Sequence, residues 1–188
     1  MKKHRKIIVF VAISADGYIA RPDGDVSWLD RPRPKGNYGY GAFFKTVDTI
    51  LWGRKTYTKG IEMGMKAGEF GLKVKNYLFS RQPQGSLLQG FEQVKEPIKP
   101  FVQRLRAQPG KDIWMMGGGE IIASFLDEGE IDEFSIHVIP ILIGEGIPLI
   151  QPRHRSISLK LLSTKKFPDG VVHLNYRVLK PRGNRTVH

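Results

Sequence analysis

The chain has 188 residues, 40% hydrophobic and 10% aromatic, a composition that predicts a single globular domain over residues 1–188 and excludes extensive disorder. It has no cysteine, which excludes disulfides, cysteine zinc sites and thiol nucleophiles, and its apolar runs are far shorter than the roughly 20 residues of a membrane span. The net charge of +12 raises the hypothesis of nucleic-acid binding. We expect a cytoplasmic protein with no membrane partner.

The predicted elements alternate strands and helices along the chain. Residues 6–14 form an almost unbroken run of β-branched and aromatic residues, which is typical of a strand buried on both faces. Shorter apolar runs that end at turn residues predict further strands at 48–52, 76–80, 91–94, 112–116 and 132–139. Helices are predicted at 42–47, after Gly53, at 100–107 and at 120–128.

The last two apolar stretches predict a hairpin. Residues 158–167 and 171–179 alternate apolar and polar side chains on either side of the turn sequence Pro168-Asp169-Gly170. Together with the alternating strands and helices before it, this hairpin predicts an α/β fold whose sheet is mostly parallel with an antiparallel edge.

The positive charge is concentrated at the two ends of the chain. Residues 1–6 carry four basic side chains and residues 177–188 carry four more, with no acidic residue in either stretch. We expect flexible, solvated basic ends over residues 1–5 and 181–188. A polybasic arm is the alternative, but no nucleic-acid-binding motif accompanies the charge, so nucleic acid is not the expected partner.

Three consecutive glycines, Gly117, Gly118 and Gly119, stand between a predicted strand and a predicted helix. Glycine lets the backbone approach a ligand closely, and the unpaired N–H groups at the start of a helix favour negative charge. A pyrophosphate fits such a site. A tight turn that requires glycine is the alternative, because the pattern is not the usual G-x-G-x-x-G dinucleotide motif.

Two further strand ends carry cations and hydroxyl groups. Gly53–Thr56 follows one predicted strand, and Ser80 and Arg81 follow the next. Because the carboxyl ends of parallel strands share one edge of a sheet, these residues are expected near the glycines. Arg54 and Arg81 would suit a phosphate monoester such as the 2′-phosphate of NADPH. For each cation taken alone, a solvated surface charge is the alternative.

These blocks carry a family resemblance that extends over about residues 6–180. The chain resembles the dihydrofolate reductase superfamily, and within it the C-terminal reductase domain of the bifunctional riboflavin-pathway deaminase-reductase and its stand-alone relatives. The matching stretches are Ile8–Ala20, Asp25–Leu29, Asp48–Tyr57, Tyr77–Arg81, Ile113–Ile122 and Ile131–Ile150.

The resemblance implies a three-layer α/β/α fold with a central mixed, mostly parallel sheet and a C-terminal antiparallel hairpin. It also implies NADPH as cofactor, a small heterocyclic substrate and a homodimer built through the later strands. The implied cofactor-binding residues are Ala12, Asp16, Ile19, Ala20, Gly53, Arg54, Lys55, Thr56, Ser80, Arg81, Gly117, Gly118, Gly119 and Glu120.

The sequence departs from the family at the substrate side. Dihydrofolate reductases place a carboxylate on the helix before the GR-x-T strand end, and residues 37–44 contain none. Tyr38 and Tyr40 are candidate proton donors, although an ordinary phenol with a pKa near 10 is a weak acid at pH 7. Asp30 is a further candidate, with a solvated loop residue as the alternative. Trp28 is expected either to wall the substrate site or to anchor the core.

The five histidines show no metal-ligand spacing, and His137 is expected to be a packed strand residue. A phosphosugar substrate would have Arg153, His154 or Arg155 available. The leading hypothesis is an NADPH-dependent reductase acting on a C=N or C=O group of a pterin-like or aminopyrimidine substrate, most like 5-amino-6-(5-phosphoribosylamino)uracil reductase of riboflavin biosynthesis. The alternatives are a dihydrofolate reductase-type activity, a non-catalytic NADP(H)-binding protein, and a nucleic-acid-associated protein.

Overall fold

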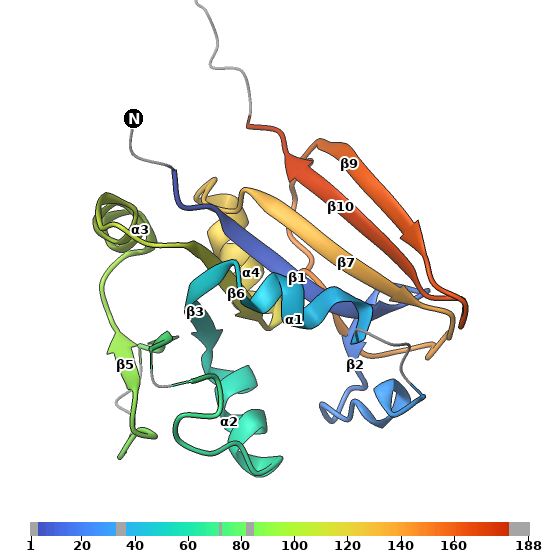
Figure 1. Cartoon of the computed structure of the whole chain (residues 1–188), viewed down its shortest axis with the longest axis horizontal. Helices are drawn as coiled ribbons and strands as arrows, with labels where there is room; N and C mark the ends of the chain where they lie inside the picture. The colour runs from blue at the N-terminus through green and yellow to red at the C-terminus, as the bar shows by residue number, and fades with distance from the viewer. Residues whose placement is uncertain (1–3, 33–36, 72, 82–84, 181–188) are drawn as a thin grey trace, which may run out of the picture.

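The computed structural model describes residues 4–32, 37–71, 73–81 and 85–180 of the chain. An eight-stranded sheet forms its centre, with the strand order β5-β4-β3-β6-β1-β7-β10-β9 (Figure 1). The first six strands in this order are parallel, and β10 and β9 add an antiparallel edge. This arrangement confirms the predicted three-layer α/β fold with a mostly parallel sheet and a C-terminal hairpin.

The strands of the large sheet are β1 (Ile7–Ser14), β3 (Val47–Gly53), β4 (Lys75–Phe79), β5 (Phe91–Val94), β6 (Asp112–Gly117), β7 (Glu133–Ile139), β9 (Leu159–Lys166) and β10 (Val172–Val178). The helices are α1 (Tyr40–Phe44), α2 (Arg54–Glu62), α3 (Ile98–Ala107) and α4 (Gly119–Asp127), with short 3-10 turns η1 (Ser27–Leu29) and η2 (Asn37–Gly39). A second, two-stranded sheet pairs β2 (Tyr18–Ala20) with β8 (Ile147–Pro148), and the sequence reasoning missed it.

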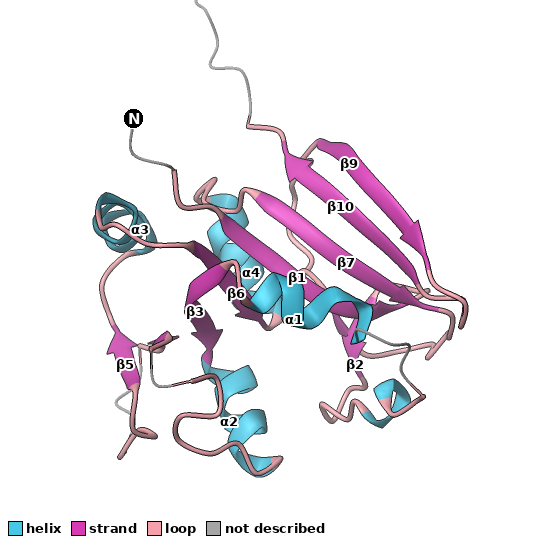
Figure 2. Cartoon of the chain, viewed as in Figure 1, coloured by secondary structure: helices cyan, strands magenta, loops and turns pink. Residues whose placement is uncertain are grey.

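Helices lie on both faces of the sheet (Figure 2). Because side chains alternate between the two faces of a strand, the core is divided between them. In β1, Ile7 and Val9 point to the face covered by α3 and α4, where Phe101 and Phe125 are fully buried. Phe10, the residue after Val9, points to the opposite face and stacks on Phe43 of α1 with ring centroids 4.3 Å apart. Because both faces are covered, β1 is apolar along its whole length.

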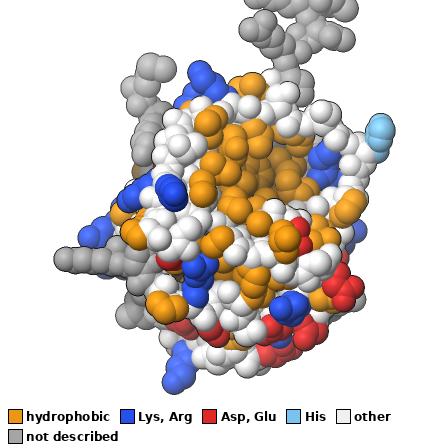
Figure 3. All heavy atoms as spheres, turned by 90° about the vertical axis from the view of Figure 1, so that its right-hand side faces the viewer, with side chains coloured by type: hydrophobic (Ala, Val, Ile, Leu, Met, Phe, Trp, Pro, Cys, Tyr) orange, Lys and Arg blue, Asp and Glu red, His pale blue; other side chains and the backbone are white. Residues whose placement is uncertain are grey.

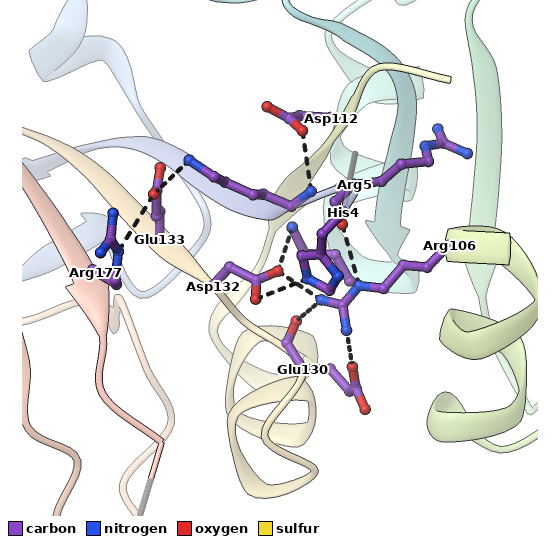
Figure 4. Close-up of polar contacts among 10 residues, drawn as sticks. His4, Arg5, Arg106, Asp112, Glu130, Asp132, Glu133 and Arg177 are labelled. Carbon is purple, nitrogen blue, oxygen red and sulfur yellow. Dashed lines mark hydrogen bonds and ion pairs between the residues drawn. The ribbon is translucent and has the colours of Figure 1, made fainter. Parts of the chain in front are cut away.

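The amino ends of the central strands are joined by a polar network (Figure 4). Arg5, only 3% exposed, donates to the carbonyl oxygens of Lys111 (2.6 Å) and Leu105 (3.1 Å), and its guanidinium also binds the Asp48 carboxylate. Arg106 of α3 binds Asp132 at 2.6 Å and the Arg5 carbonyl at 3.2 Å. The network therefore ties β1, β3, β6 and β7 to α3.

This network corrects the prediction of a flexible basic end over residues 1–5. Arg5 is buried because four protein acceptors satisfy its guanidinium. The neighbouring Lys6 pairs with Glu133 at 2.8 Å, so its charge is compensated within the fold. Residues 1–3 and 181–188 lie outside the described residues, as does the prediction made for them.

The helix-covered part of the sheet ends before its antiparallel edge. Leu161 pairs with Tyr176 and Leu159 with Val178, so these side chains share the face on which Tyr176 and Val178 extend the α3–α4 core. Leu159 is 42% exposed and Leu161 50% exposed. Figure 3, which looks at the side of the molecule where β9 and β10 lie, shows a hollow lined by apolar side chains. This edge of the sheet is thus apolar and open.

Candidate active site

A long cleft runs along the carboxyl ends of the parallel strands. Its volume of about 1730 Å³ exceeds the roughly 300–1,000 Å³ of a typical single-ligand pocket, so it has room for a dinucleotide and a second molecule. The lining residues come from the ends of β1, β3, β4, β5 and β6, and from the segments that follow them. This is the edge at which α/β sheets bind ligands.

The glycine turn lies against this cleft. Gly118 is the residue before α4, and both Gly118 and Gly119 line the cleft. A Cβ on Gly119 would come within 2.5 Å of the Pro148 carbonyl oxygen, and one on Gly118 within 3.2 Å of the Thr56 hydroxyl. Gly117 has a φ of +109°, a conformation that side chains rarely adopt. Glycine is therefore required here, and the start of α4 is open to an anionic group.

The predicted phosphate-binding residues gather at the same place. Arg54, Lys55 and Thr56 form the first turn of α2 and line the cleft, and Ser80 and Arg81 line it from the end of β4. Lys55 reaches across to Glu120 of α4 at 2.8 Å. Within the described part of the chain, Arg54 and Arg81 make no hydrogen bond or ion pair, so their guanidinium groups are available to a phosphate.

The other half of the cleft is apolar. Ala12, Ile19 and Ala20 line it as predicted, and Phe10, Trp52, Phe70 and Met116 add a wide apolar surface. These last four were missed by the sequence reasoning. The alternation of β1 could have identified Phe10, because it shares a face with Ala12, whereas Phe70 lies in a loop without a periodic signal. A flat heterocycle suits such a surface.

The structure places six predicted site residues outside the lining of the described cleft: Asp16, Trp28, Asp30, Tyr38, Tyr40 and, in the glycine turn itself, Gly117. Trp28 packs in a small cluster with Ile139 and Phe167, as the core alternative predicted. Asp30 is an exposed residue at the end of η1, which matches its surface alternative.

Both tyrosines make contacts with other parts of the protein. The Tyr38 hydroxyl donates to the Asp169 carboxylate in the β9–β10 turn. Tyr40 packs on Phe10 and Trp114, and burial, with a smaller contribution from the charge of Glu69, raises its pKa above the ordinary value. A raised pKa makes this phenol a still weaker acid, which argues against a role in proton transfer.

Asp16 has a structural role. Its carboxylate accepts the backbone N–H groups of Ile143 (3.1 Å) and Gly144 (2.8 Å), which fixes the loop after β7. The Ser14 hydroxyl and then these N–H groups hold the pKa of Asp16 below its ordinary value. The family resemblance implied that this residue binds the cofactor, whereas in the structure its carboxylate binds this loop.

The helix α1 contains no carboxylate, as the sequence indicated. Acidic side chains reach the cleft from other segments: Asp23, Glu62, Glu69, Glu96, Glu120, Asp127 and Glu128. Glu69 lies close enough to Tyr40 for its charge to act on the phenol. The described residues include no group of three His, Asp or Glu side chains arranged to hold a metal ion.

The basic residues considered for a phosphosugar lie near α4. Arg153 lines the cleft, but its guanidinium binds Asp127, and Arg155 binds the same carboxylate at 2.9 Å. None of the helices that the structure describes has the length and apolar character needed to cross a bilayer.

Comparison with known proteins identifies the family. A family model described as the RibD C-terminal domain matches residues 78–173, about half of the chain. The chain belongs to the RibD C-terminal domain family. Its cleft therefore belongs to a known reductase-like fold, and the resemblance seen in the sequence is confirmed.

Two proteins of Bacillus subtilis resemble this RibD C-terminal domain over nearly their whole length. The Uncharacterized protein YwjB is 36% identical over 168 residues, which cover 89% of this chain and 95% of that protein. The Uncharacterized protein YyaP is 32% identical over 183 residues, covering 93% and 95%. These relatives support the family and leave the substrate open.

Solved structures share the RibD C-terminal fold. A putative riboflavin biosynthesis protein from Shewanella sp. PV-4 superposes with a TM-score of 0.81 at 28% identity, covering 93% of this chain and 99% of that one. A dihydrofolate reductase from Enterococcus faecalis, solved in complex with NADP(H), has a TM-score of 0.63 at 12% identity, covering 96% of this chain and all of that one. The second likeness shows the fold alone.

Proposed function

We propose that the chain is an NADPH-dependent reductase that transfers hydride to a C=N or C=O group of a pterin-like or aminopyrimidine substrate, most like 5-amino-6-(5-phosphoribosylamino)uracil reductase of riboflavin biosynthesis. The observation that carries the proposal is the glycine cradle at the start of α4, which faces the same cleft as the open guanidinium groups of Arg54 and Arg81. Membership of the RibD C-terminal domain family supports it.

The residues present fit the cofactor. The backbone N–H groups at Gly118 and Gly119 would hold the pyrophosphate, and Arg54 and Arg81 the 2′-phosphate. When bound, NADPH supplies the hydride. The chain's own part is to exclude water and orient the acceptor, for which Phe10, Trp52 and Met116 provide an apolar surface at the other half of the cleft.

A titration with the two nicotinamide cofactors tests this proposal. We expect NADPH to bind at least tenfold more tightly than NADH, about 1.4 kcal/mol, because only NADPH carries the phosphate that Arg54 and Arg81 would bind. Binding is followed by cofactor fluorescence. Arg54→Ala and Arg81→Ala should each lose most of this preference while NADH affinity stays unchanged.

Arg177→Ala is the matched control, because Arg177 is a 53% exposed arginine of β10 outside the cleft lining. It should bind both cofactors as the native chain does. Equal affinities for NADPH and NADH would reject the phosphate clamp, and binding of neither would reject the reductase.

A non-catalytic NADP(H)-binding protein is the second candidate. The observation that favours it is the lack of a carboxylate on α1, together with the absence of Tyr38 and Tyr40 from the residues that line the described cleft. The same lack disfavours a dihydrofolate reductase-type activity. Tight NADPH binding without turnover of pterins or aminopyrimidine phosphosugars would favour the binding protein over the enzyme.

We also propose that two copies of the chain pair through the open apolar face of β9 and β10. Its exposed leucines continue the α3–α4 core without a helix over them (Figure 3). Leu161→Glu should convert a dimer into a monomer in sedimentation velocity. Lys160→Glu, on the opposite face of the same strand, should not, and a native chain that sediments as a monomer would contradict the proposal.

A further inference from the structure

One carboxylate of the β9–β10 turn contacts two residues, Arg31 and Tyr38, that follow the cleft residues Val26 and Leu29 in the sequence. Asp169 accepts the Tyr38 hydroxyl and forms an ion pair with Arg31 at 3.5 Å. The Arg31 guanidinium also donates to the Asp169 carbonyl oxygen at 2.9 Å. Arg31 and Tyr38 stand before and after residues 33–36, which lie outside the described residues, so the turn contacts the described chain at two points.

The backbone at the second point is held in an unfavourable conformation. Tyr38 has a φ of +56° and Asn37 a φ of +45°, values that non-glycine residues seldom adopt. The Tyr38 carbonyl lies 3.1 Å from the His137 Nε2, and the Tyr38 ring packs edge-on against Phe167 at 5.1 Å. Tertiary contacts on both sides therefore maintain a conformation that the local sequence disfavours.

His137 provides a rigid support for this contact. Its side chain is 3% exposed and stacks on His173 with ring centroids 4.1 Å apart. Burial, and then the neighbouring His173, lowers the pKa of His137 to about 4. The imidazole is therefore neutral at pH 7, and its Nε2–H can donate to the Tyr38 carbonyl.

Arg31 closely follows residues 26–29, which form one wall of the cleft, the Val26–Leu29 wall. Val26 and Leu29 line the cleft, and Arg31 follows Leu29 by two residues. Leu29 also packs in the cluster that contains Ala12, a residue of the apolar half of the cleft. The position of this wall relative to the end of β1 thus depends on the contacts at residues 31 and 38.

We propose that Asp169 is a positioning residue: from the β9–β10 turn, it holds the Val26–Leu29 wall over the apolar half of the cleft. The inference that this wall shields the reacting end of the cofactor rests on the proposed function. The Tyr38 hydroxyl is the main cause that holds the pKa of Asp169 below its ordinary value, so the carboxylate is charged at neutral pH and available to Arg31.

Hydrogen exchange tests the positioning role without any activity. In Asp169→Ala, amides of residues 26–31 should exchange at least about tenfold faster, while those of α3 and β6 keep their native rates. Asp169→Asn keeps an acceptor for the Tyr38 hydroxyl but loses the charge that pairs with Arg31. Its exchange rates at residues 26–31 should therefore lie between those of the native chain and those of Asp169→Ala. Glu92→Ala, an exposed carboxylate of β5 at the far edge of the sheet, is the control and should change nothing at residues 26–31.

Cofactor fluorescence supplies a second measurement. Acrylamide should quench bound NADPH more strongly in Asp169→Ala than in the native chain, with the NADPH dissociation constant changed by less than about threefold. Unchanged exchange at residues 26–31 would overturn the proposal, as would faster exchange spread equally over α3 and β6. If the native chain binds no NADPH, the proposed function fails, and the exchange measurement alone decides the role of Asp169.

Discussion

Replacement of Gly119 by alanine is expected to abolish cofactor binding and to destabilise the fold. The added Cβ would lie 2.5 Å from the Pro148 carbonyl oxygen, which belongs to the backbone of β8 and cannot rotate away as a side chain could. The Gly119 carbonyl also accepts the Gln151 N–H at 3.2 Å, so the turn is held on both sides. The start of α4 must shift, and the N–H groups that face the cleft shift with it.

We expect Gly119→Ala to weaken NADPH binding at least about a hundredfold, or 2.8 kcal/mol, and to lower the free energy of unfolding by about 1–3 kcal/mol. Cofactor titration and urea denaturation measure the two effects. Gly41→Ala is the matched control, because Gly41 has open space around its Cα and no positive φ. If Gly119→Ala bound NADPH like the control, the glycine cradle would not be the pyrophosphate site.

Most of the fold was predictable because both faces of the sheet are covered. Helices cover the sheet on each side of β1, β3 and β6, so each of these strands contains an apolar run on both of its faces, at residues 7–13, 50–52 and 113–116. The hairpin of β9 and β10 has one open face, and the alternation of apolar and polar residues in its two strands predicted it equally well. β2 and β8 were missed because strands of three and two residues are too short to show a period.

The sequence also predicted one half of the cleft better than the other. For the half that we propose to bind phosphate, the sequence predicted which residues lie together, because glycine and arginine at the ends of parallel strands share one edge of the sheet, and Gly118, Arg54 and Arg81 do line the cleft. The substrate half was not, because an aromatic residue serves equally well in a core or a pocket. Tyr38 was a candidate proton donor, but its hydroxyl binds Asp169, about 130 residues away in the sequence.

Arg5 illustrates the opposite error, since a basic residue near the chain end proved to be part of the core. Its guanidinium is satisfied by two carbonyl oxygens, the Thr49 hydroxyl and the Asp48 carboxylate. The Leu105 carbonyl lies in the last turn of α3, where the helix dipole favours a positive charge. The sequence near Arg5 contains none of these partners, so only the folded topology reveals them.

We therefore expect Arg5→Met to be among the most destabilising changes in the chain. Methionine fills much of the volume but removes the charged partner of the Asp48 carboxylate, which keeps the Lys111 N–H and the Thr49 hydroxyl. Two backbone carbonyl oxygens also lose their Arg5 donors, and each buried polar group left unsatisfied costs about 1–3 kcal/mol. Because these groups lie at the amino ends of the strands, on the opposite edge from the cleft, the folded variant should keep its NADPH affinity.

The matched control is Lys99→Met, which breaks an exposed ion pair between α3 and Glu128. Lys99 is 56% exposed and its partner 43% exposed, at a distance of 3.1 Å, and such pairs contribute about 1 kcal/mol or less. Both variants remove one cation and replace it with the same side chain. The difference between their free energies of unfolding in urea therefore measures the effect of burial. Equal losses would mean that burial adds nothing to the Arg5 network, and that the amino-terminal segment is not fixed to the sheet by its charge.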